Sequence, residues 1–206
     1  MSMDINVIVA GVGGQGSILA SHIIAEAAIN ASANPTAQNV RVGETFGAAM
    51  RGGAVASHVR IGDVHGPLVA KGQADMILAL EPLEGLRVGL EYIRRGGVAI
   101  LNSETFPPVD VKIGAARYPS IDEIEDAFGQ LGAKVTVLDA TKLALEAGTA
   151  KAMNVVMLGA AFASGLLPFA EEIMIGAIRE RVPAKFLDVN LKAFSLGKAA
   201  YGSARK

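Results

Sequence analysis

The chain has 206 residues, of which 51% are apolar and 19% charged, and its formal net charge is −1. That composition favours a large hydrophobic core and argues against a disordered chain, a nucleic-acid partner or an acidic membrane surface. The absence of cysteine from the sequence excludes disulfides, iron–sulfur clusters held by thiolates and a thiol nucleophile.

Metal-binding, export and membrane functions are also disfavoured by the sequence. The three histidines, His22, His58 and His65, lack the spacing of metal ligands. The N-terminus has neither the basic segment nor the cleavage site of a signal peptide, so we expect a cytoplasmic protein. The uncharged stretch 152–170 is interrupted by Pro168 and is too short for a membrane span, which predicts a buried helix.

In chain order, short apolar runs alternate with helical segments. The runs predict strands at 5–10, 37–42, 54–61, 75–80, 98–101, 111–117 and 134–138. The intervening patterns predict helices at 17–30, 82–96 and 120–132, the last with Ser120 and Glu123 at capping-box spacing. Only helices follow, at 141–147, 151–166, 169–181 and 184–200, with Asp139 as the expected N-cap of the first. This order predicts a three-layer α/β fold: a mostly parallel, Rossmann-like sheet with helices on both faces and a C-terminal helical tail, in one domain over 1–206.

A glycine-rich loop, Gly11-Val12-Gly13-Gly14-Gln15-Gly16, follows the first predicted strand and precedes the first helix. Glycines there let a ligand approach backbone N–H groups at a helix N-terminus, which favours phosphate or carboxylate. The run matches the dinucleotide pattern G-x-G-x-x-G, but no acidic residue stands between 31 and 43 to bind the ribose. The other interpretations are the loop of an adenylating enzyme and a tight turn that packs against a partner or touches the partner's ligand.

A second glycine-rich segment, 43–53, is also predicted to be a loop. It holds one glutamate, Glu44, and one arginine, Arg51, among small residues. Such a loop can present a guanidinium group to a phosphate or carboxylate with little steric obstruction. The alternative is an exposed turn in which Arg51 pairs with Glu44 or faces water.

Together these segments resemble the gamma-type domain of 2-oxoacid:ferredoxin oxidoreductases. The resemblance rests on Gly-Val-Gly-Gly-Gln-Gly at 11–16, Met-Arg-Gly-Gly at 50–53, Leu-Glu-Pro-Leu-Glu at 80–84, Asn-Val-Val-Met-Leu-Gly-Ala at 154–160, Arg-Val-Pro at 181–183 and Asn-Leu-Lys-Ala-Phe at 190–194. It therefore spans essentially the whole chain. The 80–84 segment and the tail are most similar to the beta subunit of indolepyruvate ferredoxin oxidoreductase. The 50–53 segment is more like gamma subunits that act on 2-oxoglutarate or branched-chain oxoacids.

The resemblance implies a small subunit that carries neither thiamine nor iron–sulfur clusters and is not active alone. Its complex would decarboxylate a 2-oxoacid, with indolepyruvate or another aryl pyruvate as the expected substrate, form an acyl-CoA from coenzyme A and reduce ferredoxin. Thiamine diphosphate, Mg²⁺ and [4Fe–4S] clusters would lie on a large alpha subunit, the expected partner. The isolated chain could also self-associate through the surface that this partner covers.

The resemblance also identifies candidate site residues. Glu44 and Arg51 are the candidates nearest the shared active site, where Arg51 would bring positive charge to the oxoacid carboxylate or a CoA phosphate. The candidate ligand-binding residues are Gly11, Gly13, Gly14, Gln15, Gly16, Arg51, Gly52, Gly53 and Asn154. Asn154 interrupts an apolar helix, so its amide either bonds to the backbone of the glycine loop or serves in capping or packing. Two rival functions stay open, an autonomous nucleotide-binding module and a purely structural subunit.

Overall fold

The computed structural model describes residues 4–31, 39–47 and 52–204. Within them, six strands form one sheet: β1 (Ile5–Val12), β2 (Asn39–Phe46), β3 (Ala54–Gly62), β4 (Ala74–Ala79), β5 (Ile93–Asn102) and β6 (Lys134–Leu138). The helices are α1 (Ser17–Ala31), α2 (Pro82–Tyr92), α3 (Val109–Lys112), α4 (Ile121–Gln130), α5 (Ala140–Ala147), α6 (Met153–Ala163), α7 (Glu171–Arg181) and α8 (Leu187–Ala204). Short 3-10 turns at Ala150–Ala152 and Ala184–Phe186 precede α6 and α8.

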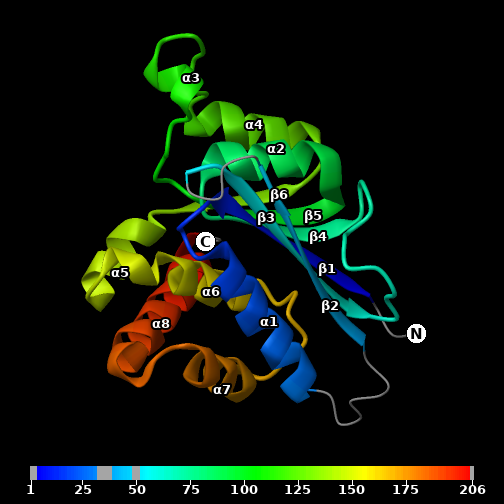
Figure 1. The fold of residues 1–206 in the computed structure, drawn as a ribbon, viewed down its shortest axis with the longest axis vertical. Coiled ribbons are helices and arrows are strands. Elements are labelled where there is room, and N and C mark those ends of the chain that lie inside the picture. Colours follow the sequence, from blue (N-terminus) through cyan, green and yellow to red (C-terminus); the bar gives the residue numbers. More distant parts are fainter. Residues whose placement is uncertain (1–3, 32–38, 48–51, 205–206) are drawn as a thin grey trace.

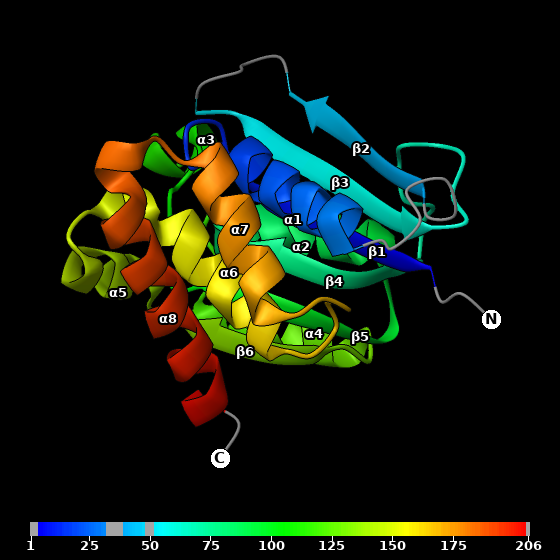
Figure 2. The ribbon, with the colours of Figure 1, turned by 90° about the horizontal axis from the view of Figure 1, so that it is seen from below.

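The sheet has the order β2-β3-β1-β4-β5-β6. Strands β1, β4, β5 and β6 are parallel neighbours, whereas β3 pairs antiparallel with both β1 and β2. Helices α1 and α5 to α8 cover one face, and α2 and α4 cover the other (Figures 1 and 2). The predicted α/β fold, with a mostly parallel sheet and a C-terminal helical tail, is confirmed.

Alternating side chains of β1 supply the two hydrophobic cores, one on each face of the sheet. Val7 and Val9 join the larger core with α1, α6 and α8, and Ile8 points to the opposite core with Phe128 of α4. All eight residues of β1 are buried, as expected for a strand covered on both faces. No helix in the described part of the chain is both long and apolar enough to span a membrane.

Two local signals for helix starts are confirmed. Ser120 and Glu123 form the predicted capping box at the start of α4. The carboxylate of Asp139 accepts a hydrogen bond from the Lys142 N–H and caps α5. Both caps satisfy N–H groups that have no partner within the helix.

The predicted strand at 111–117 is wrong. Val111 and Lys112 belong to the short helix α3, and the chain then turns at Gly114, whose φ is +76°. In Figure 1 this segment projects away from the sheet. A strand needs a neighbour to satisfy its backbone groups, and none lies beside this segment within the described residues.

The predicted loop at 43–53 is wrong over its first four residues. Gly43 to Phe46 continue β2 and pair with β3, Gly43 lying opposite His58. A Cβ at position 43 would come within 3.0 Å of Pro67 and Leu68, so close packing, rather than a turn, explains why a glycine stands there. The helix predicted at 82–96 ends early at Tyr92, where β5 begins.

Candidate functional site

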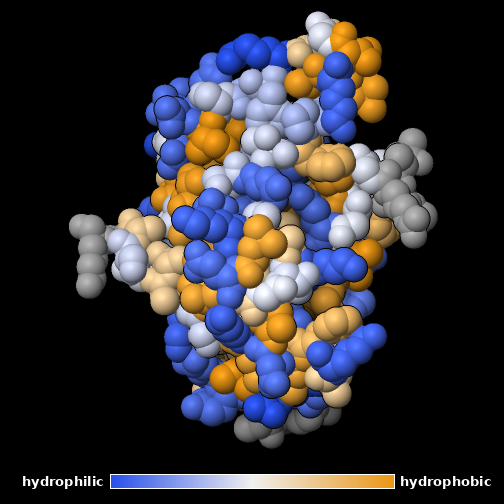
Figure 3. Space-filling view, turned by 90° about the vertical axis from the view of Figure 1, so that its left-hand side faces the viewer, coloured by the Kyte–Doolittle hydropathy of each residue, from blue (hydrophilic) through white to orange (hydrophobic). Residues whose placement is uncertain are grey.

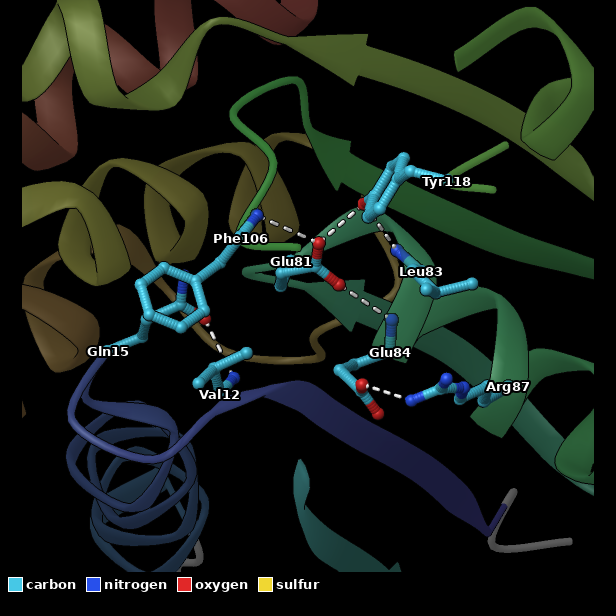
Figure 4. Close-up of polar contacts among 8 residues, drawn as sticks. All are labelled: Val12, Gln15, Glu81, Leu83, Glu84, Arg87, Phe106 and Tyr118. Carbon is cyan, nitrogen blue, oxygen red and sulfur yellow. Dashed lines mark hydrogen bonds and ion pairs between the residues drawn. The ribbon is translucent and has the colours of Figure 1, made fainter. Parts of the chain in front are cut away.

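The first glycine loop is held in a single shape by its own glutamine. The Gln15 side-chain oxygen accepts a hydrogen bond from the Val12 N–H at 2.8 Å (Figure 4). Gly14 and Gly16 have φ values of +108° and +86°, a region that favours glycine over residues with a Cβ. The loop thus leaves β1 and enters α1 at the carboxyl end of the central parallel strands.

The second glycine segment lies directly against the first. The Gly13 N–H donates to the Gly53 carbonyl at 2.8 Å, and the Gly52 N–H donates to the Gly13 carbonyl at 3.2 Å. These bonds extend the antiparallel pairing in which Val12 lies opposite Ala54. The structure therefore brings together two segments that are about forty residues apart in the sequence.

Asn154 joins α6 to the same loop. Its side-chain Nδ2 donates to the Gly16 carbonyl at 3.2 Å, and the residue is 3% exposed. Of the two roles predicted for Asn154, the structure shows the bond to the glycine-loop backbone. The same amide occupies the place that a Cβ on Gly16 would need, only 2.5 Å from Nδ2.

Of the two charged candidates in the second glycine segment, Glu44 and Arg51, only Glu44 is among the described residues. Glu44 lies on β2, where one carboxylate oxygen is 3.6 Å from Nε2 of His22 on α1. Arg51 lies outside the described residues. The ring of His22 is 41% exposed and lies next to a hollow formed by the glycine loop and Phe46.

A solvent-open hollow of about 450 Å³ lies on the other side of the glycine loop. Its lining residues are Gly14, Gln15, Gly16, Leu19, Glu104, Thr141, Ala150, Lys151, Met153 and Asn154. Lys151 makes no ion pair within the described residues, so its ammonium group is free to bind an anion. Glu104, which accepts a 2.5 Å hydrogen bond from the Thr141 hydroxyl, adds one carboxylate to the lining of the same hollow.

The sequence analysis did not identify Lys151. It precedes α6, and its N–H donates to the Thr149 hydroxyl, which is an ordinary helix-start signal. The sequence pattern does not indicate that this lysine lines the same hollow as Gly14 and Gly16, because those residues are more than 130 positions away. A lysine beside a glycine loop is suited to a phosphate or carboxylate.

Glu81, at the carboxyl end of β4, is a buried carboxylate that the sequence analysis also missed as a site residue. It is 1% exposed, and its oxygens accept hydrogen bonds from the Tyr118 hydroxyl at 2.5 Å, the Phe106 N–H at 3.1 Å and the Glu84 N–H at 2.8 Å (Figure 4). The Leu83 N–H donates to the Tyr118 oxygen at 3.2 Å. The carboxylate therefore caps α2 and fixes the chain on both sides of α3. The signal available was Glu81 directly before Pro82, a typical helix start.

Burial raises the pKa of two groups around Glu81. The pKa of Tyr118 is raised by burial first and then by its hydrogen bond to Glu81. The pKa of Glu84 is also raised by burial, although the ion pair with Arg87 at 2.6 Å acts in the opposite direction. Both groups thus favour their protonated forms more than they would in water.

The described residues do not fit the reactive groups of an oxidative decarboxylase. The sequence has no cysteine to hold an iron–sulfur cluster, and no group of three His, Asp or Glu side chains in the described residues could hold a metal ion. A dinucleotide fits poorly, because β3 lies antiparallel between β1 and β2, and the strand after α1 is not the parallel neighbour that binds the ribose. The hollow beside the glycine loop instead carries one ammonium group, that of Lys151, and one carboxylate, that of Glu104.

Comparison with known proteins identifies the family. The family model described as pyruvate ferredoxin/flavodoxin oxidoreductase matches residues 6–200. The chain belongs to this family. Among curated relatives, the indolepyruvate oxidoreductase subunit IorB of Thermococcus kodakarensis is 41% identical, over 96% of both chains.

Two solved structures of ferredoxin oxidoreductases share the fold. The keto/oxoacid ferredoxin oxidoreductase gamma subunit of Geobacter sulfurreducens is 28% identical with a TM-score of 0.67, covering 97% of this chain and 99% of that one. The 2-oxoglutarate:ferredoxin oxidoreductase of Magnetococcus marinus, solved with 2-oxoglutarate, coenzyme A and succinyl-CoA bound, is 23% identical with a TM-score of 0.70. This chain matches only 31% of that longer chain, over 97% of its own length. The predicted membership of the ferredoxin oxidoreductase family is confirmed.

Proposed function

We propose that the chain is the small subunit of a 2-oxoacid:ferredoxin oxidoreductase complex that acts on indolepyruvate or another aryl pyruvate. The observation that supports this most is the 41% identity to an indolepyruvate oxidoreductase subunit over nearly the whole of both chains. Coenzyme A is the acyl acceptor in this proposal and ferredoxin the electron acceptor. A large alpha subunit carries thiamine diphosphate, Mg²⁺ and the iron–sulfur clusters, and thiamine diphosphate supplies the decarboxylation chemistry when bound there.

This chain contributes an anion-binding wall to the shared active site. Hydrogen bonds from within the chain support the glycine loop, through the side chains of Gln15 and Asn154. Lys151 adds a positive charge at the hollow beside Gly14. Arg51, in the second glycine segment, would add a second charge toward the oxoacid carboxylate or a CoA phosphate.

The test is to co-express the chain with the large thiamine-binding subunit encoded in the same genome. The purified complex is assayed for CoA-dependent reduction of a viologen dye with indolepyruvate, phenylpyruvate, 2-oxoglutarate and 2-oxoisovalerate. We expect co-purification and turnover of the aryl pyruvates. A chain that neither associates with the large subunit nor supports turnover contradicts the proposal.

Substitutions then test the anion-binding wall. We expect Lys151→Ala and Arg51→Ala each to lower kcat/KM of the complex at least 10-fold, which corresponds to about 1.4 kcal/mol of transition-state stabilisation. Lys134→Ala is the matched control, since Lys134 is also exposed but begins β6 at the opposite edge of the sheet. Unchanged kinetics in Lys151→Ala would remove that residue from the site, and unchanged kinetics in both variants would leave the chain with an architectural role.

A second candidate is a gamma subunit for 2-oxoglutarate or branched-chain oxoacids. The Met-Arg-Gly-Gly sequence at 50–53 favours it. The same substrate panel decides between the two, because turnover restricted to 2-oxoglutarate or 2-oxoisovalerate would keep the family and change the substrate. An autonomous nucleotide-binding module would instead bind NAD, FAD or an adenylate as the isolated chain, which calorimetry can measure.

A further inference from the structure

The segment from Ser103 to Tyr118 projects from the edge of the sheet and carries α3 at its tip; we call it the arm. In Figure 1 the arm extends beyond the helical layer of α2 and α4. The arm exposes three large apolar residues: Phe106, near its base, is 47% exposed, and Val109 and Ile113, at the tip, are 69% and 70% exposed. In Figure 3 apolar surface gathers at the top of the molecule, the end that α3 occupies in Figure 1.

Both limbs of the arm are fixed at their base. The outgoing limb donates its Phe106 N–H to Glu81, and the returning limb donates its Tyr118 hydroxyl to the same carboxylate oxygen. Arg117 makes two hydrogen bonds to Glu123 of α4, at 2.7 and 2.9 Å. A buried carboxylate that joins both limbs fixes the direction in which the tip points.

The tip is ordered by its own backbone. The Ile113 N–H donates to the Val109 carbonyl at 3.0 Å, and the Ala115 N–H donates to the Asp110 carbonyl at 2.8 Å. Two consecutive prolines, Pro107 and Pro108, restrict the outgoing limb. Exposed apolar groups on a segment with this many restraints are pre-organised for contact, because little conformational freedom is left to lose on binding.

We propose that the arm is a docking element for the large thiamine-binding subunit, with Glu81 as the residue that positions it. The inference rests on the proposed function. Its base lies on the same edge as the glycine loop, since Glu81 directly follows Leu80, whose N–H donates to the Ala10 carbonyl at 2.7 Å. A partner that binds the arm is therefore brought toward the glycine loop.

The chemistry of the tip also favours a protein partner such as the large subunit. Asp110 and Lys112 cancel in charge, and the Lys112 ammonium lies 4.6 Å above the Phe106 ring, so the tip has no net charge for a nucleic acid or an anionic membrane. An apolar, concave protein surface is the complementary partner. In the Magnetococcus enzyme the part that matches this chain is joined to a remainder more than twice its size, so this fold does occur beside a much larger body.

The experiment compares the affinity of three forms of the chain for the purified large subunit. The arm variant carries Val109→Asp and Ile113→Asp, and the control carries Leu90→Asp, which is 61% exposed near the far end of α2. We expect the arm variant to bind at least 10-fold more weakly and the control within about 2-fold of wild type. Equal affinities for the arm variant and wild type would overturn the proposal, whereas wild type that fails to bind would overturn the proposed function itself.

Tyr118→Phe tests the positioning role without touching the tip. Loss of the hydroxyl frees the returning limb from Glu81 and removes the acceptor of the Leu83 N–H, so we expect faster hydrogen exchange at the Leu83 amide and weaker binding of the large subunit, at least 3-fold, with unchanged exchange in β1. Faster exchange with unchanged affinity would overturn the role of Glu81.

Sedimentation of the isolated wild type and of the arm variant tests whether the tip binds a second copy of this chain instead. If the wild type self-associates and the arm variant does not, the tip is assigned to that second copy and the proposal is overturned.

Discussion

Gly16→Ala is the substitution that best tests how the glycine loop is held. A Cβ at this position would lie 2.5 Å from Nδ2 and 3.1 Å from Cγ of Asn154, and the backbone φ of +86° disfavours any residue with a Cβ. At Gly14 the φ is +108°, but a Cβ would meet no described atom within 4 Å. Comparing Gly14→Ala with Gly16→Ala therefore separates the cost of backbone strain from the cost of the clash with Asn154.

The magnitude follows from these two contributions. Positive φ costs an L-residue about 1–2 kcal/mol, which applies to Gly14→Ala and Gly16→Ala alike. Gly16→Ala also displaces the Asn154 amide from its bond to the Gly16 carbonyl and leaves that buried amide unpaired, at about 1–3 kcal/mol. We expect Gly14→Ala to lower the free energy of unfolding by about 1–2 kcal/mol and Gly16→Ala by about 3–4 kcal/mol.

Urea unfolding, followed by far-ultraviolet circular dichroism at constant m-value, measures both costs. The decisive measurement repeats Gly16→Ala in an Asn154→Ala background, where Nδ2 and Cγ are absent and only backbone strain is left. There the cost of Gly16→Ala should fall to that of Gly14→Ala, a coupling of about 2 kcal/mol. An equal cost of Gly16→Ala in both backgrounds would refute the contact between Asn154 and the loop as the source of the effect.

Three further predictions concern packing and protonation. A Cβ on Gly197 of α8 would lie 1.8 Å from a backbone oxygen of α6, so Gly197→Ala should lower the unfolding free energy by more than about 3 kcal/mol, whereas Gly202→Ala in open space on the same helix should raise it by about 0.5–1 kcal/mol in the same urea assay. The raised pKa of Glu84 means that the folded chain binds this proton more tightly than the unfolded chain, so stability is lost as pH rises through the window above the usual carboxyl pKa. The stability of Glu84→Gln relative to wild type should therefore increase between about pH 4 and pH 7, and a pH-independent difference would contradict this assignment. The Arg117 guanidinium and the Ser120 N–H lower the pKa of Glu123 to about 2, so Arg117→Ala should raise it toward its usual range in an NMR titration, and an unchanged value would contradict this cause.

Most of the architecture was predictable because its signals are local. The buried runs of β1 and β4, the capping box at Ser120 and the cap at Asp139 lie within a few residues of the elements they define. The two incorrect segments depend on distant residues. Gly43 to Phe46 form a strand because β3 supplies their partners, and 111–117 form none because no strand lies beside them.

The candidate site was only partly predictable for the same reason. The two glycine segments stood out in the sequence, but their mutual hydrogen bonds at Gly13 depend on the pairing of β1 with β3. Lys151 lines the hollow beside the loop because it directly precedes the start of α6, which contacts α1 in the folded chain. Glu81 belongs to the Leu-Glu-Pro-Leu-Glu segment at 80–84, but its role in fixing the arm depends on Tyr118, 37 residues later, and the segment alone does not predict that role.

The structure also distinguishes the glycines that packing within the chain requires from those that leave space for a ligand. A glycine motif suggests that a ligand approaches the backbone, yet at Gly11 the space of a missing Cβ is taken by Gln15 and Leu80, and at Gly16 by Asn154. Gly14 and Gly52 differ, since a Cβ on either would meet no described atom within 4 Å. Two of the motif's glycines, Gly11 and Gly16, are therefore explained by packing within the chain, and the space open to a ligand lies beside Gly14, in the hollow that Lys151 also lines.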